Sequence, residues 1–137
     1  MTREEAKREL RPLKEMDNDI RAVEEEIERL MAIATKMTPV YDTDKVNNSF
    51  HNKIEDALIR VEEYRTKLTR LVLKNLDYKN RCLNKVSQIA PASLQKFLVY
   101  YYFQNMTLEQ MAEKIGHSSR YTYTMYEAAL DEYSKIS

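Results

Sequence analysis

The sequence is poor in glycine, cysteine and proline, and it contains no tryptophan. Its 137 residues include one glycine, Gly116, one cysteine, Cys82, and three prolines. The scarcity of glycine excludes phosphate-cradling loops, because such loops need backbone at positive φ and close approach of the ligand. It also argues against hairpin-rich β folds. The single cysteine cannot form an internal disulfide. These absences favour an all-α intracellular protein.

The charges balance, and long apolar runs are missing. There are 22 Lys and Arg residues and 22 Asp and Glu residues, so the formal net charge is zero. A uniformly basic nucleic-acid binder is excluded, and any affinity for DNA must come from the local arrangement of charge. No apolar run approaches the roughly 20 residues of a membrane span. The first residues do not have the pattern of a signal peptide. We therefore expect a cytoplasmic protein without a membrane contact.

The first segment predicts one long helix over residues 2–37. Thr2 and Glu5 have the spacing of a capping box, in which each side chain satisfies a free backbone donor. Pro12 is expected to shorten or kink the helix near its start. The apolar residues then follow the 3–4 spacing of a heptad repeat: Leu13, Met16, Ile20, Val23, Ile27, Leu30, Ala34 and Met37. Pro39 ends the pattern, and residues 38–49 predict a mobile polar connection with turn residues Asp42, Asp44, Asn47 and Asn48.

A second long helix is predicted over residues 50–89. Its apolar stripe comprises Ile54, Leu58, Val61, Leu68, Val72, Leu76, Leu83 and Val86, with Tyr64 and Leu71 at the edge. Two long helices joined by a short connection can fold back as an antiparallel hairpin. The same apolar seam can instead join two copies of the chain or bind a regulatory protein. The sequence leaves these alternatives open, and it assigns residues 1–90 to a two-helix coiled-coil region.

Residues 91–137 predict a compact module of three helices. Pro91 ends the second long helix, and a shorter helix follows over 92–103. Thr107 and Gln110 form a second capping box, which opens a helix ending near Ile115. Gly116 supplies a tight turn, and Ser118 caps a final helix that reaches about residue 133. This order of elements is the helix-turn-helix plan.

Residues 108–127 have the pattern of a DNA-reading helix-turn-helix. Ala112 is the small residue expected where the two helices cross, and Met111 and Ile115 face the core before the turn. The last helix is expected to bury Met125, Ala129 and Leu130 and to present its other face to the major groove. The candidate DNA-binding residues are Thr107, Ser118, Ser119, Arg120, Tyr121, Tyr123, Thr124 and Glu127.

The motif Thr107-Leu-Glu-Gln-Met and the later Ala129-Leu130 resemble the C-terminal, minus-35-reading domain of bacterial primary sigma factors. The whole arrangement, a coiled-coil half followed by a sigma-like helix-turn-helix, is similar to the sigma-like late-gene regulators of phages of Gram-positive bacteria. The resemblance is strongest over residues 92–133. It implies promoter DNA as the ligand, bacterial RNA polymerase as a further partner and the cytoplasm of a bacterial host as the location.

The chain departs from that family in its charge. The start of the last helix is typically rich in Arg in the family, whereas here it carries only Arg120. Residues 91–137 contain four basic and five acidic residues, a net charge of −1. Residues 65–85, by contrast, contain seven basic residues and one acidic residue. The candidate phosphate contacts on one face of this helix, opposite its predicted apolar side, are Lys67, Arg70, Lys74, Arg81 and Lys85. The same stripe can instead be an ordinary solvated helix face.

Catalytic and metal-binding patterns are missing from the sequence. His51 and His117 are far apart and have no Cys or carboxylate at metal-ligand spacing, and Cys82 has no neighbouring base. We expect no enzyme activity, no cofactor and no metal. Together with the helix-turn-helix pattern, the resemblance implies a phage or prophage transcriptional regulator, an activator that binds promoter DNA. The alternative is a protein-interaction module that binds RNA polymerase or another regulator with little or no direct contact to DNA.

Overall fold

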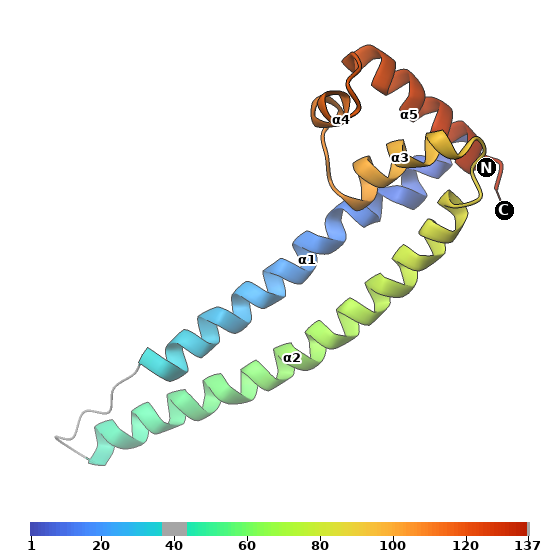
Figure 1. The fold of residues 1–137 in the computed structure, drawn as a ribbon. Coiled ribbons are helices and arrows are strands. Elements are labelled where there is room, and N and C mark those ends of the chain that lie inside the picture. The colour runs from blue at the N-terminus through green and yellow to red at the C-terminus, as the bar shows by residue number, and fades with distance from the viewer. Residues whose placement is uncertain (37–43, 137) are drawn as a thin grey trace. The chain divides into compact units, whose positions relative to one another are not determined.

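The computed structural model describes the backbone of residues 1–36 and 44–136 and the side chains of residues 1–35 and 51–136. Every regular element in these ranges is helical, which confirms the predicted all-α class. The two long helices α1 (Arg3–Lys36) and α2 (Asp44–Val86) pack antiparallel as a hairpin (Figure 1). The hairpin alternative is therefore confirmed, and pairing between two chains stays a prediction.

The chain divides into two compact units. One, called here the terminal unit, combines Met1–Asp17 with Asn75–Ser137. The other, the hairpin unit, is Asn18–Lys74. The helix-turn-helix elements therefore share a unit with the start of α1 and the end of α2. The sequence pattern placed these two segments in a separate coiled-coil region over residues 1–90.

Helix α1 follows its prediction closely. The Glu5 backbone N–H donates to Thr2 Oγ1 at 3.2 Å, as expected for a cap. The predicted seam is confirmed over residues 13–34, because each of its side chains there is buried or half-buried. Met37 lies outside the described residues. Pro12 does not shorten α1, which is continuous from residue 3. Leu10 and Leu13, fully buried on either side of the proline, stabilise the helix there.

Helix α2 begins earlier than predicted. Its first residue is Asp44 rather than one near residue 50, so the expected connection over 38–49 is wrong for residues 44–49. Residues 38–43 lie outside the described residues. An aspartate in the first turn is favoured by the positive end of the helix dipole, and the turn preference of asparagine is only a weak tendency. Asp44, Asn47 and Asn48 therefore belong to a helix and not to a turn.

The apolar seam of α2 also differs from its prediction. Leu58, Val72, Leu76 and Leu83 were expected to face the partner helix, but each is at least 40% exposed. The buried positions of α2 are Ala57, Val61, Asn75, Cys82 and Val86, and Ile54, Tyr64, Leu68, Leu71 and Tyr78 are half-buried between them. These residues continue the 3–4 spacing with small or polar side chains. A helix seam accepts such residues at its 3–4 positions, whereas the prediction placed the largest aliphatic residues there.

The C-terminal elements agree with the predicted boundaries to within two residues. A helical segment over residues 92–103 consists of a 3₁₀ turn (Ala92–Leu94), the α3 turn (Gln95–Leu98) and a π turn (Val99–Phe103). Helix α4 (Leu108–Ile115) and helix α5 (Ser119–Ser134) follow. None of the helices in the described ranges has an apolar stretch long enough for a membrane crossing.

The terminal unit has one hydrophobic core to which every one of its helices contributes. Its most deeply buried side chains include Leu10, Leu13, Val86, Leu98, Met111, Leu130 and Tyr133. Burial of one such aliphatic side chain is worth about 1.5–3 kcal/mol. The core therefore joins the start of α1 and the end of α2 to the helix-turn-helix and gives α4 and α5 a fixed platform.

Candidate nucleic-acid interface

The turn between α4 and α5 is built as the sequence predicts. Thr107 Oγ1 accepts from the Gln110 backbone N–H at 3.1 Å, and Gln110 Oε1 accepts from the Thr107 backbone N–H at 3.0 Å. Gly116 ends α4 at φ 82°, in the left-handed region, and its N–H donates to the Ala112 carbonyl at 2.9 Å. Ser118 Oγ accepts from the Tyr121 backbone N–H at 3.1 Å and begins α5. These bonds fix the angle between the two helices.

The inner faces of α4 and α5 form the expected crossing. Met111, Ala112, Ala129 and Leu130 are buried, which confirms the predicted small residue and its apolar neighbours. Met125 is only half-buried, and its predicted core position is taken by Tyr126. The physical reason is that Tyr126 reaches across the unit to a partner, because its hydroxyl lies 2.6 Å from the Tyr102 hydroxyl.

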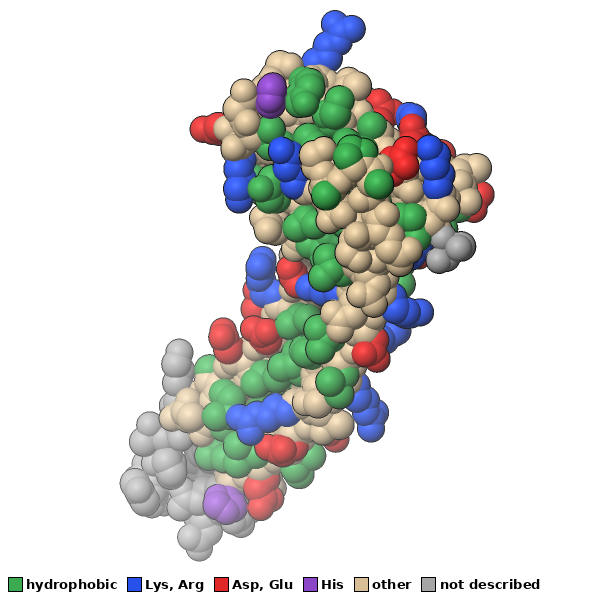
Figure 2. Space-filling model, turned by 45° about the vertical axis from the view of Figure 1, so that its right-hand side comes forward, with side chains coloured by type: hydrophobic (Ala, Val, Ile, Leu, Met, Phe, Trp, Pro, Cys, Tyr) green, Lys and Arg blue, Asp and Glu red, His purple; other side chains and the backbone are tan. Residues whose placement is uncertain are grey.

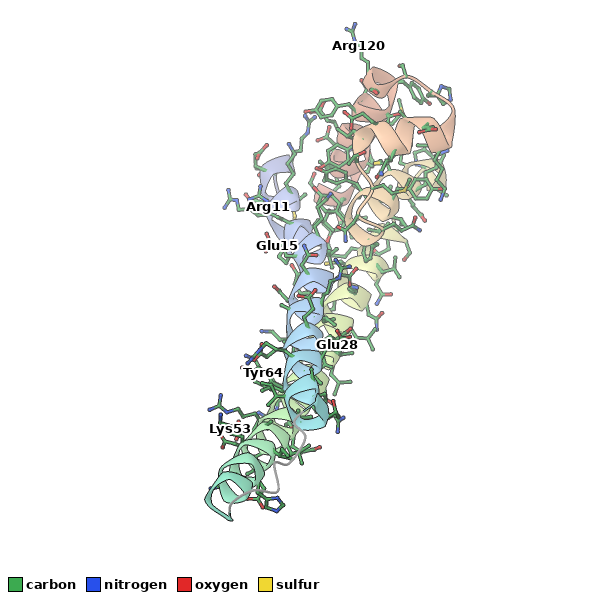
Figure 3. The ribbon with its side chains drawn as sticks, turned by 90° about the vertical axis from the view of Figure 1, so that its left-hand side faces the viewer. Arg11, Glu15, Glu28, Lys53, Tyr64 and Arg120 are labelled. Atoms are coloured by element: carbon green, nitrogen blue, oxygen red, sulfur yellow. The ribbon has the colours of Figure 1, made fainter. Side chains whose placement is uncertain are left out.

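The first turns of α5 face solvent. Ser119, Arg120 and Thr124 are exposed, and so are Tyr121 and Tyr123 at about two-fifths of their surface each. Figure 3 shows the Arg120 side chain extending away from the terminal unit. The His117 ring lies 4.2 Å from the Tyr121 ring, between centroids. Thr107 and Ser118 use their hydroxyls as caps. Seven of the eight candidate DNA-binding residues are therefore exposed, Thr107 at the start of α4 and the other six around the start of α5.

Glu127 is the eighth candidate, and it is held by an ion pair. Arg3 of α1 donates to the Glu127 carboxylate and, through two further nitrogen atoms, to Asp131. The hydrogen bond from Arg3 lowers the pKa of the Asp131 carboxyl below its ordinary value. Two of the five acidic groups of residues 91–137 are therefore paired with a cation that the sequence had placed in another region.

Only some residues of the predicted phosphate stripe on α2 are exposed to solvent. In the hairpin unit, Lys67, Arg70 and Lys74 are exposed. In the terminal unit, Arg81 is exposed, with its guanidinium 5.4 Å from the Tyr78 ring. Lys85 is different, because its Nζ lies 3.0 Å from a Glu9 oxygen and 4.6 Å from the Tyr133 ring centroid. Its side chain is only 17% exposed. Lys85 therefore stabilises the terminal unit rather than facing solvent.

The structure adds a basic row that the sequence reading missed. Lys7, Arg11 and Lys14 follow one another along α1 at spacings of four and three residues, so they share a helix face. They line a cavity of about 210 Å³ in the terminal unit. The rest of the lining is formed by Tyr101, Tyr102, Leu108, Tyr123 and Tyr126. The spacing was visible in the sequence, but the aromatic wall opposite it depends on the tertiary fold.

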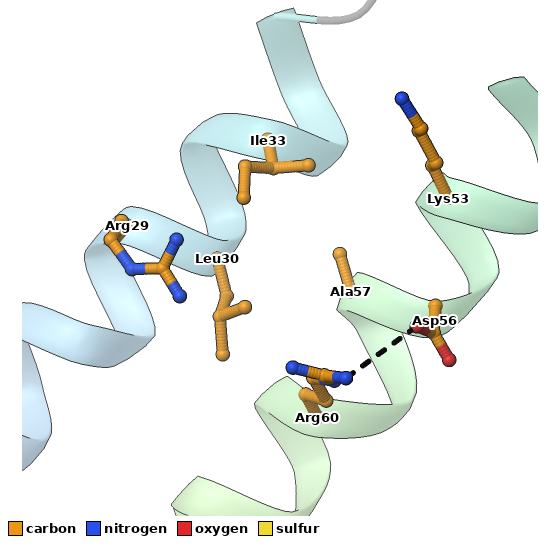
Figure 4. Close-up of a pocket in the computed structure, with 7 residues that line it drawn as sticks. All are labelled: Arg29, Leu30, Ile33, Lys53, Asp56, Ala57 and Arg60. Carbon is orange, nitrogen blue, oxygen red and sulfur yellow. Dashed lines mark ion pairs between the residues drawn. The ribbon is translucent and has the colours of Figure 1, made fainter.

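A second, larger cavity lies in the hairpin unit. It has a volume of about 350 Å³ and is lined by Arg29, Leu30, Ile33, Lys53, Asp56, Ala57 and Arg60 (Figure 4). Arg60 is ion-paired with Asp56 at 3.8 Å, and Arg29 is ion-paired with Glu26 at 2.6 Å. These carboxylates neutralise two of its three cations, so the cavity offers no concentrated charge.

The described side chains offer no metal-binding group, since no three His, Cys, Asp or Glu among them are placed to hold an ion. Cys82 is buried, and burial raises the pKa of its thiol, which disfavours the reactive thiolate. The features that remain are the exposed start of α5 and the basic row of α1. No protein-family model matches the chain, and neither curated proteins nor solved structures give a match.

Proposed function

We propose that the protein is a transcriptional regulator of phage or prophage genes, an activator that binds promoter DNA through α4 and α5. The observation that carries the proposal is the capped turn at residues 116–118, which presents the first turns of α5 to solvent. A recognition helix enters the major groove with its N-terminal residues against the base edges. The resemblance of this motif to sigma factors, and not a measured activity, supplies the promoter as its target.

Each exposed side chain of α5 has a chemical use in the groove. Arg120 can donate to guanine O6 and N7 with two nitrogen atoms, a contact worth about 1–3 kcal/mol of base discrimination. Tyr121 and Tyr123 present rings to a thymine methyl group or hydroxyls to phosphate oxygens. Ser119 and Thr124 complete a polar surface.

The charge of the terminal unit fits DNA better than that of residues 91–137 alone. Residues 1–17 and 75–137 together contain 12 basic and 11 acidic residues, a net charge of +1 in place of −1. Arg3 pairs with Glu127 and Asp131 of α5 and offsets one of their two negative charges. Phosphate neutralisation supplies most non-specific affinity for DNA, so this local gain of positive charge supports the proposal.

The test is a gel shift with host and phage genomic fragments, followed by titration of the wild type and an Arg120→Ala variant. We expect Arg120→Ala to weaken binding to the preferred fragment by about 5- to 150-fold, the range that corresponds to 1–3 kcal/mol. Thermal stability should not change, because Arg120 is exposed. Lys96→Ala is the matched control, an exposed cation of the same unit outside α5. Equal affinity of Arg120→Ala and the wild type would contradict the proposal.

A second candidate function is a protein-interaction module that binds RNA polymerase. Large apolar side chains reach the surface of the long helices (Figure 2), and those of α2 include Leu58, Ile59, Val72, Leu73, Leu76 and Leu83. Where such side chains join into a contiguous apolar patch, they form a surface that can bind another protein. This candidate predicts that purified bacterial RNA polymerase retains the wild type but not a Leu76→Glu variant, and that neither binds DNA alone.

A further inference from the structure

The cavity beside α1 has one basic wall and one aromatic wall. Lys7, Arg11 and Lys14 stand on α1, and Tyr101, Tyr102, Tyr123 and Tyr126 stand on the π turn and on α5. All of these residues belong to the terminal unit. Arg11 lines the cavity and is exposed, and Figure 3 shows its place on α1. Lys14 lies deeper, with its Nζ 3.4 Å from the centroid of the Tyr101 ring.

The cations of this wall have little compensation from carboxylates. Neither Arg11 nor Lys14 forms an ion pair with any residue in the described part of the chain. Lys7 has only a 3.5 Å contact with Glu4, whose side chain is 71% exposed. Lys14 is half-buried, and this burial lowers the pKa of its ammonium group. A bound anion would restore the favourable interactions that this ammonium gives up.

The arrangement suits a phosphate group better than a carboxylate. A carboxylate is planar and is satisfied by one guanidinium, whereas phosphate presents several oxygens to donors from different directions. The row extends about 10 Å along α1, from a rise of 1.5 Å per residue over seven residues. Tyr123 lines the cavity and lies one turn from Arg120 on α5, so phosphates beside a groove-bound α5 would meet this wall.

We infer that the cavity between α1 and the tyrosine cluster binds a phosphate group, with Arg11 and Lys14 as its main ligands and Lys7 as a third. The group comes either from the backbone of DNA or from a free phosphate ester. For the DNA source, the inference rests on the proposed function and deepens it, because it assigns the phosphate contacts to α1. For the free ester, it stands without that function.

The first experiment uses inorganic phosphate and no DNA. The full chain is titrated with phosphate at constant ionic strength, and amide and ring resonances of Tyr101 and Tyr123 are followed by NMR. We expect saturable shifts confined to the cavity. The variant Arg11→Gln/Lys14→Gln should bind phosphate at least tenfold more weakly, since it loses two charge-assisted hydrogen bonds. If the double variant is unstable, the single variant Arg11→Gln replaces it. Arg11 is exposed, and its replacement should also weaken phosphate binding.

The matched control is Arg8→Gln/Lys96→Gln. It removes the same charge from exposed positions of the terminal unit, and neither residue lines the cavity. Its phosphate affinity should stay within twofold of the wild type. Equal losses in the two double variants would show a general charge effect and would overturn the inference, and so would shifts that never saturate in the wild type.

The second experiment identifies the source of the phosphate. If it is the DNA backbone, Arg11→Gln/Lys14→Gln should make the slope of log K against log salt shallower by about 1.8, at roughly 0.9 per contact, without changing sequence preference. An unchanged slope together with saturable phosphate binding assigns the cavity to a free phosphate ester. If the wild type binds no DNA, the proposed function fails, and the phosphate titration still decides the inference. If the variant keeps both the phosphate affinity and the salt dependence of the wild type, the inference is overturned.

Discussion

Arg3, at the start of α1, binds Asp131, near the end of α5, through a two-point ion pair. Arg3 Nε lies 2.7 Å from Asp131 Oδ1, and Arg3 Nη2 lies 2.7 Å from Asp131 Oδ2. The residues are 128 positions apart in the sequence. This contact, with the neighbouring one to Glu127, attaches the first turn of the chain to the helix proposed to read DNA.

The ion pair predicts a pH dependence of stability. The pKa of Asp131 in the folded protein lies below its ordinary value of 3.8, so the carboxylate stabilises the fold above that value. The stabilisation is lost as the pH falls through the lowered pKa. We expect the difference in the free energy of unfolding between the wild type and Asp131→Asn to be constant near neutral pH, to shrink as the pH falls below 3.8, and to vanish once Asp131 is protonated in the folded and the unfolded protein. Urea denaturation at a series of pH values measures it.

Arg3→Gln provides the control for this ion pair, because it removes the cation and leaves the carboxylates. Its stability deficit should close over the same acidic range. The deficit should be modest in both variants, since both side chains are partly exposed and such pairs are screened by salt. A deficit that persists unchanged to pH 2 would mean that the residues stabilise the fold through packing.

Substitutions at Gly116 distinguish the cost of backbone strain from that of steric contact. A Cβ atom added at this position meets no atom within 4 Å, so only its φ of +82° opposes a larger residue. We expect Gly116→Ala to destabilise the terminal unit by about 1–2 kcal/mol and Gly116→Val by more, because β-branched residues tolerate the left-handed region poorly. Gly116→Asn should cost clearly less than Gly116→Ala, because asparagine adopts this conformation more readily. Thermal melts rank the three, and equal costs for Ala and Asn would contradict a left-handed turn.

Tyr102 and Tyr126 should be energetically coupled. Their hydroxyls form a buried hydrogen bond of 2.6 Å, so removing one leaves the other without its partner. We expect Tyr102→Phe and Tyr126→Phe each to destabilise the protein by about 1–2 kcal/mol, and the double variant to cost less than the sum of the two. A double-mutant cycle in urea measures the coupling. Tyr123→Phe, at an exposed position, serves as the control, and strictly additive effects would exclude the bond.

The exposed cations of α2 give a prediction that distinguishes phosphate contact from base reading. Lys67, Arg70 and Lys74 changed together to Gln should keep the helix, because Gln is a good helix former. If they contact phosphates, the slope of log K against log salt becomes shallower by about 2–3, at roughly 0.9 per contact. The preference for cognate over random DNA should hold, in contrast to Arg120→Ala, which should reduce it. An unchanged slope would leave these residues as a solvated face.

Local signals predicted the fold well where one residue type decides the geometry. Thr107, Gly116 and Ser118 act through their own backbone or the next turn, so the sequence around them was sufficient to place α4 and α5. The seam of α2 contains Ala57 and Asn75, whereas the larger aliphatic residues beside them, Leu58 and Leu76, are exposed. The 3–4 spacing of the buried row is present in the sequence, but the size of the side chains favoured the neighbouring residues.

The sequence predicted the candidate site only for the residues that lie on α5 itself. Arg120 and the tyrosines of α5 were found from the capped turn, because exposure follows from helical periodicity. Two ion pairs, Arg3–Glu127 and Lys85–Glu9, join segments that are far apart in the chain. The cavity beside Lys14 has the same origin. Such contacts follow from the return of α2 to the start of α1, which composition and spacing do not specify.

The division of the terminal unit between the two ends of the chain has a consequence for its assembly. Residues 1–17 are separated from residue 75 by the 57 positions of Asn18–Lys74, a loop whose closure costs conformational entropy before any contact in the unit is gained. The hairpin unit closes that loop, since pairing of α1 with α2 returns the chain to its starting point. Substitutions that weaken its seam at Ala57 and Val61 are therefore expected to slow the assembly of the terminal unit, although neither residue belongs to that unit.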